Sequence, residues 1–257
     1  MKILAVGDVT SPRAAEALAQ RLPEFKKQNG VDLAIVNGEN AGFILGPTVE
    51  IARKMLFSGA DVLSGGNHTL QNLSLHRLLE EDTRMLRPCN YPKGVPGRGY
   101  TIRRVRDRRV LVINALGRVH MEPPLDSPFT AIDRVLQKEE GRYDLSVVDF
   151  HAEATGEKLA MARYLDGRVT VLFGTHTHVP TADDGVLPRG TGYVTDLGMC
   201  GGRDGVMGID SDVILKRYLT GLPEKFAPAE GPIVCDGVLF TVDDVSGKTL
   251  STLRVRF

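Results

Sequence analysis

The sequence contains few cysteines, and their spacing does not follow the pattern of a disulfide-bonded domain. Among 257 residues there are three cysteines, Cys89, Cys200 and Cys235, an odd number at wide spacing. Disulfide-stapled domains carry even sets of cysteines at close, regular intervals. The pattern therefore predicts a protein of a reducing compartment without a disulfide framework, and we expect a cytoplasmic location.

The chain also lacks an excess of charge of either sign. It has 32 Lys plus Arg and 32 Asp plus Glu, so no global field attracts a nucleic acid or a membrane surface. No stretch approaches the roughly 20 apolar residues of a membrane span. The first residues, MKILAVGDV, lack the long apolar region and cleavage site of a signal peptide, which favours a buried first strand. A nucleic-acid substrate, such as an RNA-derived end, would have to be captured locally by a site.

Apolar runs of strand length alternate with segments of helical period. Strands are expected at Lys2–Val6, Asp32–Val36, Asp61–Leu63, Leu145–Phe150 and Val169–Phe173. Helices are expected at Ser11–Gln28 (with Ser11 as N-cap and an interruption at Pro23), Thr48–Phe57, Leu73–Glu81, Thr130–Glu140 and Ala154–Leu165. Hairpins are expected at Tyr100–Val105 with Arg109–Asn114 and at Gly237–Val242 with Leu250–Phe257, and a long loop at Arg87–Gly99. This order predicts an α/β fold with a mixed sheet system and helices outside, in one domain spanning residues 1–257.

Five of these strands are followed at once by polar residues of the kind that bind metals. These residues are Asp8, Glu39, Asn40, Asn67, His68, His151, His176 and His178. The carboxyl edge of an open α/β sheet is where sites are built, so we expect these side chains to converge. The set offers carboxylate, amide and imidazole groups without thiolate, which suits Mn²⁺, Fe²⁺ or Zn²⁺. Two such metals about 3.5–4 Å apart can clamp a phosphate and hold a bridging hydroxide for in-line attack.

Each residue taken alone is compatible with an ordinary structural role. Asp8 could equally cap the helix that begins near Pro12, and Glu39 with Asn40 could simply form a turn. His151 alone is typical of a hydrogen-bonded structural histidine. The coincidence of all the groups at strand ends is what favours a site over these alternatives.

The motifs around these residues resemble those of a known family. GD at Gly7–Asp8, GEN at Gly38–Asn40, GNH at Gly66–His68, the later His151, and GTHTH at Gly174–His178 are similar to those of the calcineurin-like metallophosphoesterases. The longer strings NGEN, GGNHT, RPCNYP, PGRGY, DFHAEATGEK, DGRVTVLFGTHTHVPTAD and GTGYVTDLGM resemble the YmdB-like subfamily from the first strand to about Gly208.

The resemblance implies a four-layer α/β/β/α sandwich of the calcineurin-like metallophosphoesterase type with a dinuclear centre. One metal would take Asp8, Glu39, Asn40 and His178, and the other Glu39, Asn67, His151 and His176. His68 would be the catalytic general acid or would orient the phosphate. The family is associated with 2′,3′-cyclic nucleotide phosphodiesterase activity, with iron or manganese as the expected metals and zinc also compatible.

The chain departs from the broad superfamily in two places. Thr10 stands where a histidine is usual, while Glu39 replaces the bridging aspartate and Asn40 would supply the lost ligand. After GNH, Leu70 and Gln71 replace an aromatic residue and an acid that would orient His68. A phosphomonoesterase with the same ligands and a non-catalytic nucleotide sensor remain alternatives, and a homo-oligomer is compatible with a chain of this size.

Several polar residues near the motifs have less defined roles at this stage. Arg87 and Arg98 either contact the substrate phosphate or brace the loop that contains them, and the second interpretation is favoured. Glu153, Asp183 and Asp196 are interpreted as structural or supporting residues around the metals.

Overall fold

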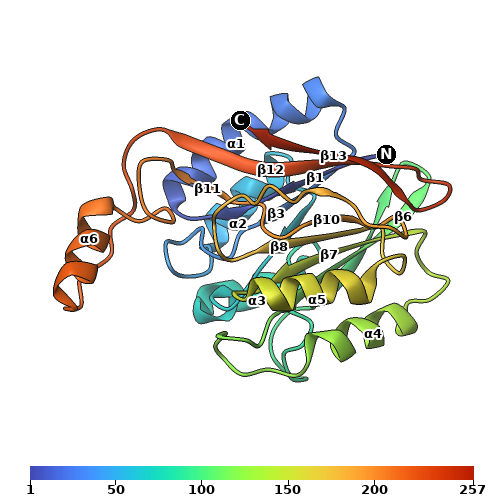
Figure 1. Cartoon of the computed structure of the whole chain (residues 1–257), viewed down its shortest axis with the longest axis horizontal. Helices are drawn as coiled ribbons and strands as arrows, with labels where there is room; N and C mark the ends of the chain where they lie inside the picture. Colours follow the sequence, from blue (N-terminus) through green and yellow to red (C-terminus); the bar gives the residue numbers. More distant parts are fainter.

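The computed structural model describes residues 1–257 and contains two mixed β-sheets (Figure 1). The first sheet has seven strands, in the order β2 (Asp8–Val9), β11 (Met199–Gly202), β12 (Ile233–Val242), β1 (Lys2–Val6), β3 (Leu33–Asn37) and β4 (Val62–Ser64), with β13 (Thr249–Arg256) paired to β12. Strands β1, β3 and β4 run parallel, so their carboxyl ends lie at one edge.

The second sheet has six strands. Their order is β5 (Tyr100–Val105), β6 (Arg108–Leu116), β7 (Leu145–His151), β8 (Val171–Thr175), β10 (Gly192–Val194) and β9 (Gly185–Val186). Strands β6, β7, β8 and β10 are parallel, and β5 and β9 are antiparallel edges.

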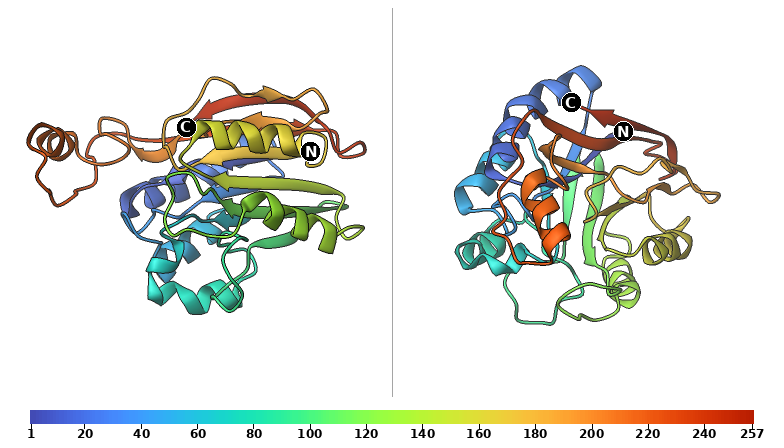
Figure 2. Two further views of the ribbon diagram at one scale, coloured as in Figure 1. Left: turned by 60° about the horizontal axis from the view of Figure 1, so that its bottom comes forward. Right: turned by 60° about the vertical axis from the view of Figure 1, so that its left-hand side comes forward.

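Two layers of helices cover the outer faces of the sheets. They comprise α1 (Pro12–Asn29), α2 (Val49–Phe57), α3 (His76–Glu81), α4 (Pro128–Lys138) and α5 (Thr155–Leu165), with short 3₁₀ turns at Thr69–Gln71 and Leu73–Leu75. Helices α1 and α2 pack on the first sheet, and α4 and α5 on the second (Figures 1 and 2). A third apolar cluster joins the two sheets, with Ile35 and Phe240 from one and Val147 and Phe173 from the other. The predicted α/β/β/α sandwich is therefore confirmed.

Local sequence explains most of these elements. The hydroxyl of Ser11 accepts a hydrogen bond from the amide of Ala14 at 3.1 Å, and Pro12 opens α1, as predicted. The predicted interruption at Pro23 is wrong, because α1 continues to Asn29. Pro23 itself lies on the exposed side of the helix, where its ring does not disturb the packed face.

The region after β8 holds elements that the sequence did not predict. Strands β9, β10 and β11 are short and rich in glycine, so they lack the apolar runs from which strands are inferred. Helix α6 (Ser211–Thr220) projects from the end of the molecule in Figure 1. It buries only Ile214, and so carries little of the periodicity that identifies a packed helix. No helix in the structure has the length and apolar character that crossing a membrane requires.

Candidate metal centre

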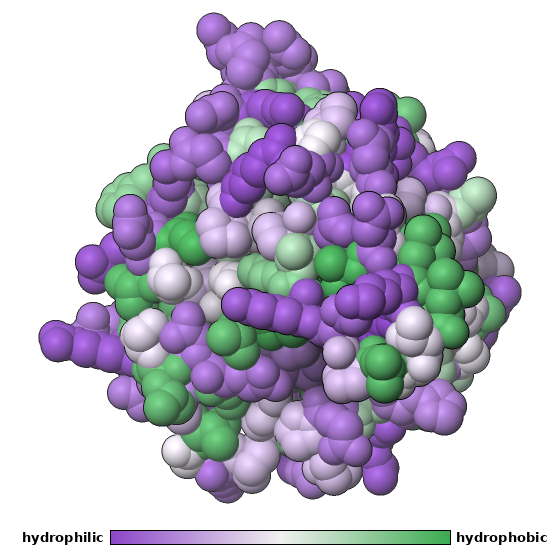
Figure 3. All heavy atoms as spheres, turned by 90° about the vertical axis from the view of Figure 1, so that its left-hand side faces the viewer, coloured by the Kyte–Doolittle hydropathy of each residue, from purple (hydrophilic) through white to green (hydrophobic).

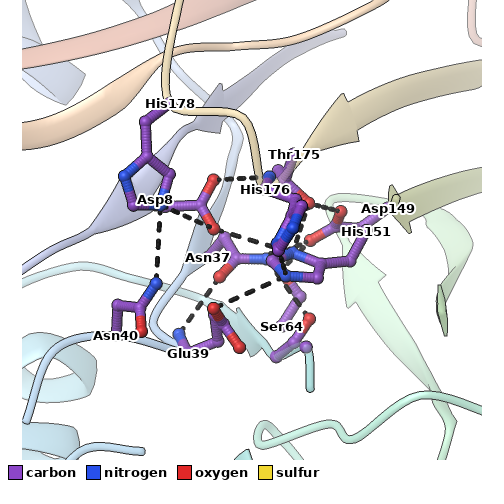
Figure 4. A network of polar contacts seen from close by, with 12 residues as sticks. Asp8, Asn37, Glu39, Asn40, Ser64, Asp149, His151, Thr175, His176 and His178 are labelled. Carbon is purple, nitrogen blue, oxygen red and sulfur yellow. Dashed lines mark hydrogen bonds and ion pairs between the residues drawn. The ribbon is translucent and has the colours of Figure 1, made fainter. Parts of the chain in front are cut away.

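The residues singled out by the sequence meet at the carboxyl edges of both sheets (Figure 4). Asp8 forms β2 just after β1, and Glu39 and Asn40 lie in the turn after β3. Asn67 and His68 follow β4 in the same sheet. The second sheet contributes His151 at the end of β7, and His176 and His178 after β8. The packing of one sheet on the other therefore brings together ligand-type groups that lie up to 170 positions apart.

One group of donors surrounds the ring of His151. Its Nε2 lies 3.1 Å from Nδ1 of His176, 3.2 Å from Oδ1 of Asn67 and 3.5 Å from Oε1 of Glu39. Two ring nitrogens and two oxygens thus point at one small volume. Glu39, His151 and His176 satisfy the spacing expected of a shared metal ion.

A second group lies on the other side of Asp8. Its Oδ1 is 3.8 Å from Nε2 of His178, which is 3.4 Å from the side-chain amide of Asn40. The Oδ1 atoms of Asp8 and of Asn40 are buried and have no hydrogen-bond partner. Buried oxygens without a donor are costly, and a bound cation would satisfy both. The alternative in which Asp8 caps α1 is excluded, since Ser11 performs that role.

Three neighbouring groups fix which nitrogen of each histidine faces the cluster. Nδ1 of His178 lies 3.0 Å from the carbonyl of Met207, so Nε2 is left as the electron-pair donor. Nε2 of His176 lies 3.1 Å from Glu153, which leaves Nδ1. Metal-binding histidines in proteins are held in this way through the other ring nitrogen. Glu153, interpreted from sequence as a supporting residue, therefore contacts a histidine of the cluster directly.

The hydroxyl of Thr175 is the third group, and it fixes the ring of His151. Its Nδ1 lies 2.9 Å from the hydroxyl of Thr175, which in turn donates to Oδ1 of Asp149 at 2.7 Å. The oxygen of the threonine hydroxyl can therefore accept a hydrogen bond from Nδ1–H, so Nε2 of His151 is the nitrogen that faces the cluster.

The electrostatics of the pocket favour a cation. Burial disfavours a charged ring at His151, but the carboxylates of Glu39 and Asp8 outweigh it and raise its pKa to about 9. Burial together with the nearby His151 lowers the pKa of His176 to about 3. Burial opposes ionisation of Glu39, yet His151 and His68 hold its pKa well below the usual range. Two buried carboxylates thus stabilise positive charge beside them, which is what a divalent cation requires.

The backbone at the cluster is tight and strained. A Cβ added to Gly66 would lie 2.4 Å from Nε2 of His151 and 2.6 Å from Oε2 of Glu39, so only glycine fits. His176 and His178 have φ angles of 97° and 62°, which residues other than glycine rarely adopt. Strain of this kind concentrates at functional sites, where the surroundings impose the conformation.

His68 borders the cluster and also lines the cavity that opens beside it. Its backbone N–H donates to Oε2 of Glu39 at 2.9 Å, and its Nδ1 lies 3.0 Å from Oε1 of the same carboxylate. Gln71, at the position of the expected acid, instead reaches the carbonyl of Asn67 at 3.4 Å. Glu39 therefore supplies the carboxylate that orients His68.

A buried polar layer beneath the cluster was missed in the sequence. Asp149 accepts hydrogen bonds from Ser64, from Thr175 and, at 3.0 Å, from Asn37. Burial raises the pKa of Asp149 to about 6. Asn37 also accepts from the amide of Glu39 at 3.1 Å, which connects the layer to a cluster residue. The sequence did contain a signal for these two residues, because Asn37 in LAIVN and Asp149 in LSVVDFH are polar residues in otherwise apolar strands.

A buried ion pair supports the loop that carries His176 and His178. Nζ of Lys158 lies 2.8 Å from Oδ2 of Asp196, and both side chains are buried. The same carboxylate accepts from the amide of Thr177 at 3.1 Å and from its hydroxyl at 2.7 Å. Asp183 bonds instead to Thr195 and Thr181, away from the cluster.

The remaining motif residues have structural contacts. Arg87 donates to the carbonyl of Pro88 at 2.8 Å and Arg98 to that of Glu80 at 3.2 Å, which agrees with the interpretation that both brace their loop. The hydroxyl of Thr10 lies 3.3 Å from the carbonyl of Cys200, so this position contributes a backbone contact in place of an imidazole.

Comparison with known proteins extends these observations. A 2′,3′-cyclic-nucleotide 2′-phosphodiesterase of Bacillus subtilis is 40% identical over 255 residues, covering 99% of this chain and 96% of that protein. A hypothetical protein from Thermus thermophilus has a similar crystal structure, with a TM-score of 0.92 and 38% identity over 100% of this chain and 99% of that one. A phosphatase from Mycoplasma pneumoniae gives a TM-score of 0.92 and 31% identity over 100% and 93%. The family model described as YmdB-like protein matches residues 4–255, and the chain belongs to this family.

Proposed function

We propose that this protein is a phosphodiesterase that hydrolyses 2′,3′-cyclic nucleotides with the help of two divalent cations, iron or manganese. One observation carries the proposal: carboxylate, amide and imidazole donors from both sheets converge, and two buried oxygens among them have no hydrogen-bond partner. Such a donor set suits hard or borderline metals and binds phosphate oxygens through them.

The two groups of donors divide the ligands between two cations. One cation would be held by Asp8, Glu39, Asn40 and His178, and the other by Glu39, Asn67, His151 and His176. Glu39 would belong to both sites, since its carboxylate lies 3.5 Å from Nε2 of His151 and is also close enough to Asp8 for the two carboxylates to repel each other. When bound, the cations would neutralise the phosphoryl oxygens and lower the pKa of an attacking water.

His68 would transfer the proton that the leaving oxygen needs. Its Nδ1 faces Glu39 at 3.0 Å and keeps its proton there. His68 would therefore act in its imidazolium form, in which Nε2, 3.3 Å from the side-chain amide nitrogen of Asn67, carries the proton for the leaving oxygen. The ring lines the cavity beside the cluster, which places it within reach of a bound phosphodiester. In a 2′,3′-cyclic phosphate the leaving group is a ribose hydroxyl, for which a general acid is useful.

The named activity of the Bacillus subtilis relative supports the diester as substrate, since the two chains match over nearly their whole lengths. The relative from Mycoplasma pneumoniae, which has lower identity, is described as a phosphatase. A phosphomonoester is therefore the alternative substrate, and the test includes one.

The test compares two neighbouring variants of the metal-loaded full chain. Asn67→Ala removes a proposed ligand and should lower both the bound metal and the turnover of a 2′,3′-cyclic nucleotide. His68→Ala removes the proposed acid and should lower kcat by about 10²–10⁴-fold while the metal content stays near two per chain. Metal content is measured by elemental analysis, and turnover on the cyclic nucleotide, a linear diester and a monoester.

Asn29→Ala is the matched control, because Asn29 ends α1 and its side chain bonds to the carbonyl of Phe25, far from the cluster. Loss of metal in His68→Ala would show that this residue is a ligand. Fast turnover of the monoester alone would support a phosphatase, and absence of bound metal in the wild type would refute the proposal.

A further inference from the structure

A cavity of about 340 Å³ opens beside the candidate metal centre. One wall consists of Asn40, His68, His176 and His178, which belong to the cluster or border it. A cavity of this size is in the range that holds a nucleotide-sized ligand. A molecule whose phosphate lay at the proposed metal ligands would extend its remaining atoms into this space.

A second part of the lining, the wall considered below, has different chemistry. It is formed by aromatic and aliphatic side chains with a single permanent cation: Phe43, Ile44, Met207, Arg217, Tyr218 and Phe226. No carboxylate lines the cavity. This wall suits a flat, uncharged ring system, and one cation on an exposed helix makes a poor site for a second polyanionic group.

The chain is held in disfavoured conformations where it forms this wall. Phe43, Ile44 and Met207 have φ angles of 63°, 62° and 55°. A left-handed backbone is especially unfavourable for a β-branched residue such as Ile44. Residues kept in such conformations concentrate at ligand sites. The loop also begins directly at Asn40, whose carbonyl accepts from the amide of Phe43 at 2.8 Å, so the wall and a proposed ligand are one local unit.

The other side of the wall comes from the segment around α6. The guanidinium carbon of Arg217 lies 5.0 Å from the centre of the Phe226 ring. A guanidinium stacked on an aromatic ring forms a flat surface on which a nucleobase can stack. Helix α6 projects at the left of Figure 1, and Figure 3 shows the face that carries it, where hydrophobic and hydrophilic side chains are mixed.

We propose that this wall is the subsite that binds the nucleobase of the substrate, with the stacked pair of Phe226 and Arg217 as its main contact. The inference rests on the proposed function, since the phosphate of the same molecule would lie at the metal ligands. Stacking tolerates any base, because every base has an aromatic face, and we expect purines to bind better through their larger ring area.

The experiment compares ligands with and without a base on the manganese-loaded full chain. Affinities for adenosine 3′-monophosphate and for the abasic ribose 3-phosphate are measured by calorimetry, and kcat/KM for the corresponding 2′,3′-cyclic phosphates. Phe226→Ala should reduce the preference for the ligand with a base by roughly 5- to 100-fold, the loss expected for one stacked base. Arg217→Met should act in the same direction, and Phe226→Tyr should retain the preference.

Leu219→Ala is the control, because Leu219 lies on the same helix, is 84% exposed and does not line the cavity. Its preference should equal that of the wild type. If Phe226→Ala and Arg217→Met bind the two monophosphates with the wild-type preference, the subsite is wrong, even where the cyclic nucleotide is hydrolysed. If the wild type hydrolyses neither cyclic phosphate but Phe226→Ala still loses the preference in binding, the proposed reaction fails and the subsite stands.

Discussion

The buried pair of Lys158 and Asp196 offers a sharp test of how the fold supports the candidate metal centre. Lys158 lies on α5 and is 1% exposed, and Asp196 is fully buried. The ammonium donates to the carboxylate at 2.8 Å, and that carboxylate binds Thr177 between the two histidines of the loop. Lys158→Met removes the charge and its hydrogen bond and keeps an unbranched apolar side chain that is one atom shorter.

The expected cost follows from what remains around Asp196. Removing one partner of a buried ion pair costs about 3–5 kcal/mol, because the other charge is left without compensation. Asp196 would still accept from the amide and the hydroxyl of Thr177 and from the amide of Gly198 at 2.9 Å. We therefore expect the lower end, about 3 kcal/mol, which corresponds to a fall in Tm of roughly 6–12 °C for a chain of this length.

Thermal unfolding of the metal-free protein measures this cost, and calorimetric titration with Mn²⁺ measures the effect on the loop. Lys54→Met is the matched control, since Lys54 pairs with Glu16 on the surface, where both side chains are about half exposed. Such a surface pair contributes little to stability, because water and salt screen its charges. Equal Tm changes in the two variants would refute the assignment of Lys158 as a buried support. A loss of stability with unchanged Mn²⁺ affinity would show that the pair does not position the loop.

Two further predictions concern the surroundings of the proposed metal ligands. Gly66→Ala would place a Cβ 2.4 Å from Nε2 of His151, so we expect metal content and activity to fall together, while Gly156→Ala, which meets nothing within 4 Å, should change neither. Wild-type metal content in Gly66→Ala would mean that the cluster can move to accept the methyl group. Glu153→Gln removes the carboxylate that faces Nε2 of His176 at 3.1 Å and should weaken Mn²⁺ binding by roughly 10- to 100-fold, measured by titration against a competing chelator. If the Mn²⁺ affinity equals that of the wild type, Glu153 does not contribute to metal binding through His176.

Much of the fold could be predicted from the order of residues, because its main strands are buried on both faces. The apolar runs of β1, β3 and β7 stand out for that reason, and each was predicted within one or two residues. Strands β9 to β11 and helix α6 could not be found in the same way. The three strands are only two to four residues long and contain glycine, and α6 buries only Ile214, so the contacts that stabilise these elements lie outside any local pattern.

The site shows the same division. The convergence of the eight motif residues could be predicted from their positions, because polar side chains that directly follow buried strands are collected at one edge of each sheet. Their roles as metal ligands and general acid stay predictions. Asn37 and Asp149 were missed as supporting residues, although they bond to each other at 3.0 Å from different sheets. Their relation depends on the packing of one sheet against the other, which no spacing along the chain encodes. That residues 1–257 act as one domain stays a prediction.

The sequence by itself determined the type of chemistry: which donors are present, that they follow strands, and that thiolates are not among them. Tertiary structure decided how those donors are used. It turned the free nitrogen of each histidine toward the cluster through Thr175, Glu153 and the carbonyl of Met207. It also placed Phe43 and Phe226 around the cavity beside the candidate metal centre. The physical reason is that ligand type is a property of single residues, whereas the direction of a lone pair and the shape of a cavity arise only from contacts between distant segments.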